Sequence, residues 1–260
     1  MRIGRIQNNR TDIGFDKVVS QGLEFIEYCC NNETESDTLC ADTKLILCQK
    51  ERTGLDISCV GRWNHDVQAG GIIIPEKREK YFALIDAAIA VGAKTFVCGV
   101  NKDESISLYK NYTNAIDFLG SLIDHAGGKI KIAIQNCHWN NFLISPKEWE
   151  VVLGELTELY LKYDPSHAYK RGGDYLGELS DWGERVAHFH VKGAVTTGSR
   201  AVDDPPAGMD DINWGAVFAI LYARGYNGDL SIEPHSKTWS GELGNAGVVF
   251  TRDFIKKYIV

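Results

Sequence analysis

The sequence predicts a single α/β domain over residues 1–260, in which eight parallel strands alternate with helices and close into a (β/α)8 TIM barrel. Three observations support this fold class. Short apolar runs alternate with longer helical patterns from end to end, as in a sheet whose outer face is covered by helices. Eight such runs occur, which is the number that the closed barrel needs. No linker or low-complexity stretch divides the chain, and 260 residues suit one large domain.

The strands are placed by apolar runs, several of which show little alternation and are therefore typical of strands buried on both faces. An open doubly wound sheet is the alternative, and it usually has a glycine-rich phosphate turn after its first strand. Residues 6–10 read I-Q-N-N-R and lack that motif, which favours the barrel. We expect strands at Arg2–Ile6, Glu24–Cys29, Ile57–Trp63, Thr95–Val100, Lys131–Gln135, Leu159–Asp164, Val186–Lys192 and Asp229–Glu233.

Capping signals place helices between these strands. Pro75 begins one helical pattern, and Ser145 with Glu148 forms a capping box around Pro146. Asn213 is a suitable N-cap, and glycines follow several of the patterns. We expect helices over Lys80–Val91, Ser107–His125, Trp149–Leu156 and Trp214–Ala223.

Composition limits the partners of the protein. The net charge of −7 argues against a nucleic acid held through its phosphates. The seven cysteines are odd in number and show no C-x-x-C spacing, so neither a disulfide framework nor a cysteine zinc site is indicated. The N-terminus lacks the apolar stretch of a signal peptide, and no apolar run is long enough for a membrane span. We expect a cytoplasmic protein with no membrane or nucleic-acid partner, and a homo-oligomer is left open.

The segment Val186–Lys192, V-A-H-F-H-V-K, alternates strictly. His188, His190 and Lys192 therefore share one face of a strand, and the apolar residues share the other. Two imidazoles and an ammonium need polar partners if they are buried. The pattern fits either a half-exposed strand with a polar outer face or a strand end that lines a metal or substrate site.

Acidic residues and histidines gather where the expected strands end. Asp164 and Glu233 end two strands, and only His125 among the seven histidines lies elsewhere. In such a barrel the chemistry sits at the C-terminal ends of the strands, so we expect these groups to converge. Carboxylates with one imidazole suit Mn²⁺, Mg²⁺, Co²⁺ or Zn²⁺. The histidines at this rim are His65, His138, His167, His188, His190 and His235.

Four motifs give the chain a family resemblance, which is strongest from Lys131 to Trp239. They are Y-D-P-S-H at 163–167, H-F-H-V-K within 186–192, G-M-D-D-I-N-W at 208–214 and G-Y-N-G-D-L-S-I-E-P-H at 225–235. The chain resembles the sugar phosphate isomerase/epimerase superfamily of xylose isomerase-like barrels. This resemblance implies one divalent metal, held by Glu, Asp, His and Glu from strands five to eight.

By motif, the implied metal ligands fall on Gln135, Asp164, His190 and Glu233, and His167 matches a residue that holds a substrate oxygen. Gln135 departs from the family pattern, which commonly has Glu there. An amide oxygen still coordinates a metal, with less charge, but it cannot accept a proton at ordinary pH. The paired-glutamate scheme of the family's epimerases therefore loses one member. Either His138 replaces it, or Glu233 acts alone.

The resemblance implies a divalent-metal-dependent isomerase or epimerase that acts on a sugar, keto-sugar or polyol through an enediolate, with Mn²⁺ the preferred metal. Glu233, His138 and Lys192 are the expected catalytic residues, with Lys192 an electrostatic helper. Trp63 and Trp139 could form an aromatic wall against the sugar. Arg200, in the long loop Thr196–Asp211, could meet an anionic group. The expected substrate-binding residues are His167, His188, Trp63, His65, Arg200 and His235.

Three other functions compete with this one. A metal-dependent lyase or dehydratase acting on a keto-sugar or cyclitol is the closest, because a site with a single base suits β-elimination. A DNA-repair endonuclease is disfavoured by the missing Glu and by the acidic net charge. A non-catalytic sugar-binding barrel would leave Gln135 as the mark of a decayed site, which the retained Asp164, His190 and Glu233 argue against.

Overall fold

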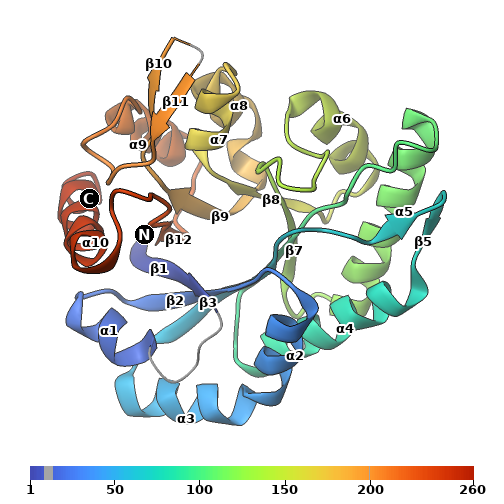
Figure 1. The fold of residues 1–260 in the computed structure, drawn as a ribbon, viewed down its shortest axis with the longest axis horizontal. Helices are drawn as coiled ribbons and strands as arrows, with labels where there is room; N and C mark the ends of the chain where they lie inside the picture. Colours follow the sequence, from blue (N-terminus) through green and yellow to red (C-terminus); the bar gives the residue numbers. More distant parts are fainter. Residues whose placement is uncertain (9–13, 199) are drawn as a thin grey trace.

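The computed structural model describes residues 1–8, 14–198 and 200–260, and it confirms the closed barrel. Eight parallel strands pair in the order β1-β12-β9-β8-β7-β6-β3-β2, and helices surround them (Figure 1). The strands are β1 (Arg2–Asn8), β2 (Phe25–Cys30), β3 (Asp56–Arg62), β6 (Thr95–Cys98), β7 (Lys131–Gln135), β8 (Tyr160–Tyr163), β9 (Val186–Val191) and β12 (Asp229–Ile232).

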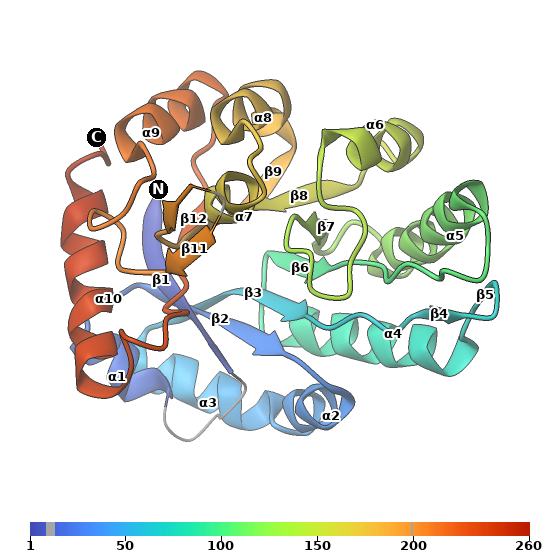
Figure 2. The same cartoon turned by 45° about the horizontal axis from the view of Figure 1, so that its top comes forward.

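Each barrel strand is followed by at least one helix, as Figure 2 also shows from a tilted direction. Two short antiparallel hairpins, β4 (Gln68–Ala69) with β5 (Ile72–Ile73) and β10 (Val195–Thr197) with β11 (Arg200–Asp203), lie in loops that follow strands. The helices are α1 (Gly14–Ser20), α2 (Glu33–Ala41), α3 (Thr43–Thr53), α4 (Pro75–Ala90), α5 (Leu108–Ala126), α6 (Pro146–Glu155), α7 (Pro165–Lys170), α8 (Tyr175–Trp182), the 3₁₀ turn η1 (Gly183–Arg185), α9 (Trp214–Ala223) and α10 (Gly241–Lys256).

Every strand expected from the apolar runs overlaps a barrel strand, and the capping signals mark helix ends as predicted. Ser107 accepts a hydrogen bond from the amide of Lys110, and Asn213 accepts one from Ala216. Ser145 and Glu148 form the expected capping box. Of residues 6–10, which lack the glycine-rich motif, residues 6–8 belong to β1 and residues 9 and 10 lie outside the described residues.

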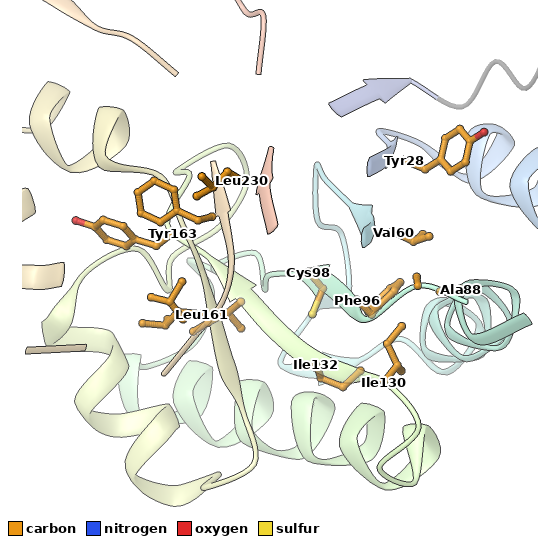
Figure 3. Packing of buried hydrophobic residues seen from close by; sticks show 14 of the residues in the cluster. Tyr28, Val60, Ala88, Phe96, Cys98, Ile130, Ile132, Leu161, Tyr163 and Leu230 are labelled. Atoms are coloured by element: carbon orange, nitrogen blue, oxygen red, sulfur yellow. The ribbon is translucent and has the colours of Figure 1, made fainter. Parts of the chain in front are cut away.

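Two separate groups of apolar side chains are packed on either side of the strands. The larger one fills the space between strands and helices, and Figure 3 shows part of it, including Phe96, Ile132 and Leu161. The smaller one lies within the barrel and consists of Ile6, Cys29, Cys59, Trp63, Val97 and Ala133. These residues come from β1, β2, β3, β6 and β7 or directly follow them, so the space beside β8, β9 and β12 is left to polar side chains.

Polar residues fill that remaining space, and several of them are fully buried. Lys162, His188 and His190 are each at most 1% exposed, and Glu27 and Gln135 are not exposed at all. Each such group costs free energy unless it is paired, which marks this side of the barrel as the place to look for a site. Within the described ranges, no helix has the length and apolar character that crossing a membrane needs. All seven cysteines are free thiols.

Candidate active site at the barrel mouth

The position of Asp164, directly after β8, is determined by the local sequence Asp-Pro. The following Pro165 fits the first turn of α7, where no amide donor is needed, so the strand stops and a helix starts. Asp164 is the N-cap, and its Oδ1 accepts a hydrogen bond from the amide of Ser166 at 2.8 Å. Its second oxygen, Oδ2, is buried and accepts no hydrogen bond from the described residues, but it forms an ion pair with the ammonium of Lys192 at 3.1 Å. The cap therefore uses one carboxylate oxygen and leaves the other for a cation.

Glu233 directly follows β12, and its backbone is held by a hydrogen bond from its amide to the carbonyl of Val191 at 3.1 Å. Its Oε2 lies 3.0 Å from His190 Nδ1 and 3.0 Å from Lys192 Nζ. Burial raises the pKa of Glu233, but the Lys192 ammonium and the hydrogen bond from His190 outweigh it and hold the pKa well below its usual range. The side chain is 17% exposed, so this carboxylate reaches solvent.

Lys192 lies at the centre of these groups. Its Nζ is 3.0 Å from Glu233 Oε2, 3.1 Å from Asp164 Oδ2 and 3.1 Å from His167 Nε2. Burial lowers the pKa of Lys192, but the two carboxylates outweigh it, so the pKa is raised above its ordinary value. Burial and the neighbouring ammonium lower the pKa of His167 well below its usual range, so its imidazole is neutral. The mouth cluster of Asp164, His167, Lys192 and Glu233 thus carries one positive and two negative charges.

Glu27, on β2, is a residue that the sequence analysis missed. Its Oε2 lies 2.7 Å from His188 Nε2 and 2.8 Å from His190 Nε2, across the barrel from its own strand. Burial raises the pKa of Glu27, but the two imidazoles lower it well below its usual range. Burial also lowers the pKa of His190, yet Glu27 and Glu233 raise it overall. Glu27 therefore orients His190, whose other nitrogen faces Glu233.

The available signal for Glu27 was a single charged residue in the otherwise apolar run F-I-E-Y-C-C at 25–30. A carboxylate in such a run needs a buried partner, but the sequence does not say which strand lies opposite.

Gln135 ends β7 and is fully buried. Its amide nitrogen lies 2.9 Å from His65 Nε2, and the other ring nitrogen of His65 lies 3.1 Å from the hydroxyl of Tyr81. Burial lowers the pKa of His65 to about 3, so this ring is a neutral hydrogen-bonding group. The oxygen Gln135 Oε1 accepts no hydrogen bond from any residue that the structure describes. His65 thus holds the amide in an orientation that leaves a buried oxygen for another ligand.

The described residues suit a divalent cation in donor type and spacing. Asp164, His167 and Glu233 each offer an oxygen or nitrogen atom, and these atoms all lie within 4.8 Å of one another. Glu27, His188 and His190 form a second such group, and Cys137, His138 and His167 form a third. Asp164 Oδ2 and Gln135 Oε1, which accept no hydrogen bond from the described residues, add to this fit. The buried triads are thus consistent with a metal site of the kind predicted.

The structure brings His167 next to Asp164 and Glu233, and it places His190 deeper, between Glu27 and Glu233. Of the predicted ligands, Asp164 and Glu233 share one group of donor atoms with His167. His190 contacts Glu233 through Nδ1 at 3.0 Å but belongs to the group with Glu27 and His188. Both of its nitrogens are engaged by carboxylates in this arrangement. A direct bond from His190 to a metal therefore stays a prediction, as does a bond from Gln135.

A cavity of about 670 Å³ opens above this cluster. Trp63 and Trp139 both border it, as the aromatic-wall hypothesis requires, and the Trp63 ring stacks on His190 with 6.5 Å between ring centroids. The volume is in the usual range for a small-molecule site. The predicted residues that border it are Trp63, His138, His167, Lys192, Glu233 and His235.

Three predicted substrate-binding residues lie away from the cavity lining. His65 and His188 are fully buried and hydrogen-bond Gln135 and Glu27, respectively. Arg200 is exposed on the β10–β11 hairpin, next to residue 199, which lies outside the described part of the chain. Contact of these three with a substrate stays a prediction, whereas the two histidines contact other site residues directly.

Comparison with solved structures supports the fold. D-psicose 3-epimerase from Clostridium cellulolyticum H10 matches with a TM-score of 0.81 at 14% identity, over 100% of this chain and 99% of the other. The 3-keto-D-glucoside 4-epimerase of E. coli matches with a TM-score of 0.76 at 14% identity, over 99% of both chains. A probable 3-DHS dehydratase from Bacillus anthracis matches with a TM-score of 0.73 at 15% identity, over 98% of this chain and 99% of the other.

At these identities the structural matches show a shared fold and no more. No curated protein matches the chain in sequence. A family model described as xylose isomerase-like TIM barrel matches residues 15–258, which is nearly the whole chain. Together with the closed barrel and the buried donors at its mouth, this match shows that the chain belongs to the xylose isomerase-like TIM barrel family.

Proposed function

We propose that the protein is a divalent-metal-dependent isomerase or epimerase that acts on a sugar, keto-sugar or polyol through an enediolate. One observation carries this proposal. Two carboxylates and an imidazole, from Asp164, Glu233 and His167, lie within 4.8 Å of one another beneath a cavity of about 670 Å³. Oxygen and nitrogen donors of this kind are the ones Mn²⁺ and related ions use. The epimerase structures that share the fold are in accord with it.

The metal would be held by Asp164 and Glu233, with an imidazole from His167 or His190 and the amide oxygen of Gln135 as neutral donors. Mn²⁺ is the first choice, and Mg²⁺, Co²⁺ or Zn²⁺ are alternatives. When bound, such an ion supplies Lewis-acid polarisation of a sugar carbonyl and the adjacent hydroxyl.

The side chains at the mouth would carry out proton transfer, substrate hydrogen bonding and charge stabilisation. Glu233, which reaches solvent, accepts the proton from the carbon next to the carbonyl and returns it. His167 is neutral, so it can donate or accept a hydrogen bond at a substrate hydroxyl. The ammonium of Lys192 stabilises negative charge that develops on oxygen. His138 is exposed at the rim and can exchange a proton with the other side of the sugar carbon.

A dehydratase acting by β-elimination is the second candidate, and one observation favours it. Glu233 is the only carboxylate among the described residues that line the cavity, and Gln135 stands at the position where the family commonly has a second Glu. A single base is enough for β-elimination, in which one carbon-bound proton is removed and the hydroxyl on the neighbouring carbon leaves as water. The dehydratase with the same fold is in accord with this alternative.

A single experiment separates these functions. The protein is incubated in D₂O with Mn²⁺ and a panel of keto-sugars and cyclitol ketones, and products are examined by NMR and mass spectrometry. An isomerase or epimerase incorporates deuterium at one carbon next to the carbonyl. A dehydratase gives an unsaturated product lighter by one water. A chelator should abolish either reaction. Substrates returned unchanged and free of deuterium, with metal bound, would contradict both candidates and favour a binding protein.

We also propose that the protein works in a reducing compartment, because of the state of its cysteines. All seven cysteines are free thiols, and four of them, Cys29, Cys30, Cys59 and Cys98, are buried. Burial raises the pKa of each of these four thiols, so they are protonated and unreactive. We therefore keep the cytoplasm as the proposed location.

A further inference from the structure

Within the described part of the chain, the Lys192 ammonium pairs only with side chains that belong to the candidate metal site. The three residues within its reach are Asp164, His167 and Glu233, at 3.1, 3.1 and 3.0 Å. These are the same three residues whose donor atoms lie within 4.8 Å of one another. An ion held by those atoms would need the space that the ammonium occupies, because a zinc–carboxylate oxygen distance, for example, is about 2.0–2.2 Å.

We propose that Lys192 is an internal competitor for the metal: its ammonium holds Asp164 and Glu233 together without an ion, and a divalent cation binds only when Lys192 moves out. This inference rests on the proposed function for the identity of the site. Beyond that function, we infer that Lys192, which is not a metal ligand, lowers the affinity of the site for the metal.

Charge supports the competition. The described mouth cluster has two carboxylates, and one of their negative charges is already balanced by Lys192. Gln135 contributes an oxygen but no charge. A divalent ion placed beside a retained ammonium would meet net repulsion, so both cations cannot share the two carboxylates at close range.

Space for the movement is present. Lys192 is only 2% exposed, yet it borders the cavity of about 670 Å³ together with Glu233. Its long side chain can therefore leave the carboxylates and place its ammonium in that cavity without unfolding β9. In the cavity, the ammonium lies beside any bound sugar and can donate hydrogen bonds to it. Metal binding would therefore place a hydrogen-bond donor next to the substrate.

Mn²⁺ titration by calorimetry tests the proposal directly. We expect Lys192→Met to bind Mn²⁺ at least about tenfold more tightly than the wild type, because the competing charge is gone. Lys192→Gln keeps a polar side chain and should shift affinity in the same direction, which covers the case in which the Met variant folds poorly. Lys170→Met is the matched control, since Lys170 borders the same cavity but pairs with Asp204 at 2.8 Å. Its affinity should equal that of the wild type.

A second readout uses the unmodified sequence. Lys192 should be protected from an amine-acylating reagent in metal-free protein and become labelled when Mn²⁺ is added, as followed by peptide mass spectrometry. Unchanged labelling with Mn²⁺ bound would contradict the movement. Equal and tight Mn²⁺ binding by the wild type and both Lys192 variants would overturn the competition but leave the metal-dependent function standing. Absence of Mn²⁺ binding in all variants would overturn both.

Discussion

The two ends of the barrel each carry a buried aspartate among cations, but their polar atoms are satisfied to different degrees. At the N-terminal end, Asp229 accepts hydrogen bonds from Arg2 Nε at 2.8 Å, Arg2 Nη2 at 2.7 Å and Ser58 at 2.7 Å. Arg2 also bonds Asp56 at 2.7 Å. At the mouth, Asp164 has one oxygen in a helix cap, and its other oxygen accepts no hydrogen bond from the described residues and is held by an ion pair with Lys192 at 3.1 Å.

Open space does not distinguish the ends, because a cavity of about 480 Å³ lies beside Asp229 and one of about 670 Å³ lies beside Glu233. The difference is in the unsatisfied donors and acceptors. Among the described residues, the buried oxygens without a hydrogen bond include one each of Gln135 and Asp164 at the mouth and none of Asp229. A saturated ion cluster stabilises the fold, whereas an unsaturated one keeps binding capacity for a ligand.

The largest expected effect comes from Glu233→Gln at the mouth. Loss of the proton acceptor should lower turnover by about 10²–10⁴-fold, with little change in the fold, because the amide can still accept a hydrogen bond from His190. Deuterium incorporation into the keto-sugar measures turnover, and circular dichroism checks the fold. A variant as active as the wild type would remove Glu233 from its proposed role.

Glu27→Gln should show that the mouth depends on a residue buried beneath it. Glu27 pairs with His188 and His190 and is not exposed, so its loss removes a buried carboxylate that two buried imidazoles share. We expect the free energy of unfolding to fall by about 3 kcal/mol, measured in urea. Mn²⁺ affinity should fall as well, because His190 loses its orientation. A variant with unchanged stability and unchanged affinity would mean that Glu27 has no positioning role.

Asp229→Asn is the matching change at the other end. Arg2 loses a bidentate partner. Its side chain is 30% exposed, so solvent compensates part of the lost interaction, and we expect the unfolding free energy to fall by about 2 kcal/mol, less than for a fully buried ion pair. Turnover and Mn²⁺ binding should stay as in the wild type. A large loss of activity in a folded Asp229→Asn protein would contradict the claim that the Asp229 end only stabilises the fold.

The pH dependence of that loss follows from the pKa of Asp229. Burial raises it, but hydrogen bonds from Arg2 and Ser58 lower it below the ordinary value of 3.8. A depressed carboxyl pKa stabilises the fold above the unfolded-state pKa and loses this effect as pH falls through the folded-state pKa. The stability difference between wild type and Asp229→Asn should therefore be constant above about pH 5 and shrink below about pH 4. A difference that grows in acid would contradict the pairing.

The smallest effect is expected for Trp139→Ala. The side chain is 46% exposed at the cavity, so its removal should change unfolding free energy by no more than about 0.5 kcal/mol. The KM for the sugar should rise roughly threefold, because an aromatic contact with the substrate is lost. Tyr109→Ala, which removes an exposed ring on α5 that does not border the cavity, is the control and should leave KM unchanged.

Much of the fold was predictable because strands, caps and turns are encoded locally. The runs ending at Gln135 and Asp164 were placed within a residue of the structure, and the family motifs selected Asp164 and Glu233. The role of Glu27 was not predictable, because it depends on which strand faces β2 across the barrel. The central place of Lys192 depends in the same way on the register of β9 against β8 and β12.

The central claim is that the unsaturated cluster at the mouth, and not the saturated one, binds a divalent ion. Electron paramagnetic resonance of Mn²⁺ mixed with wild type, Asp164→Asn and Asp229→Asn at millimolar protein tests it most directly. We expect bound Mn²⁺ in the wild type and in Asp229→Asn, and its loss in Asp164→Asn. Equal binding by Asp164→Asn and the wild type would contradict the account.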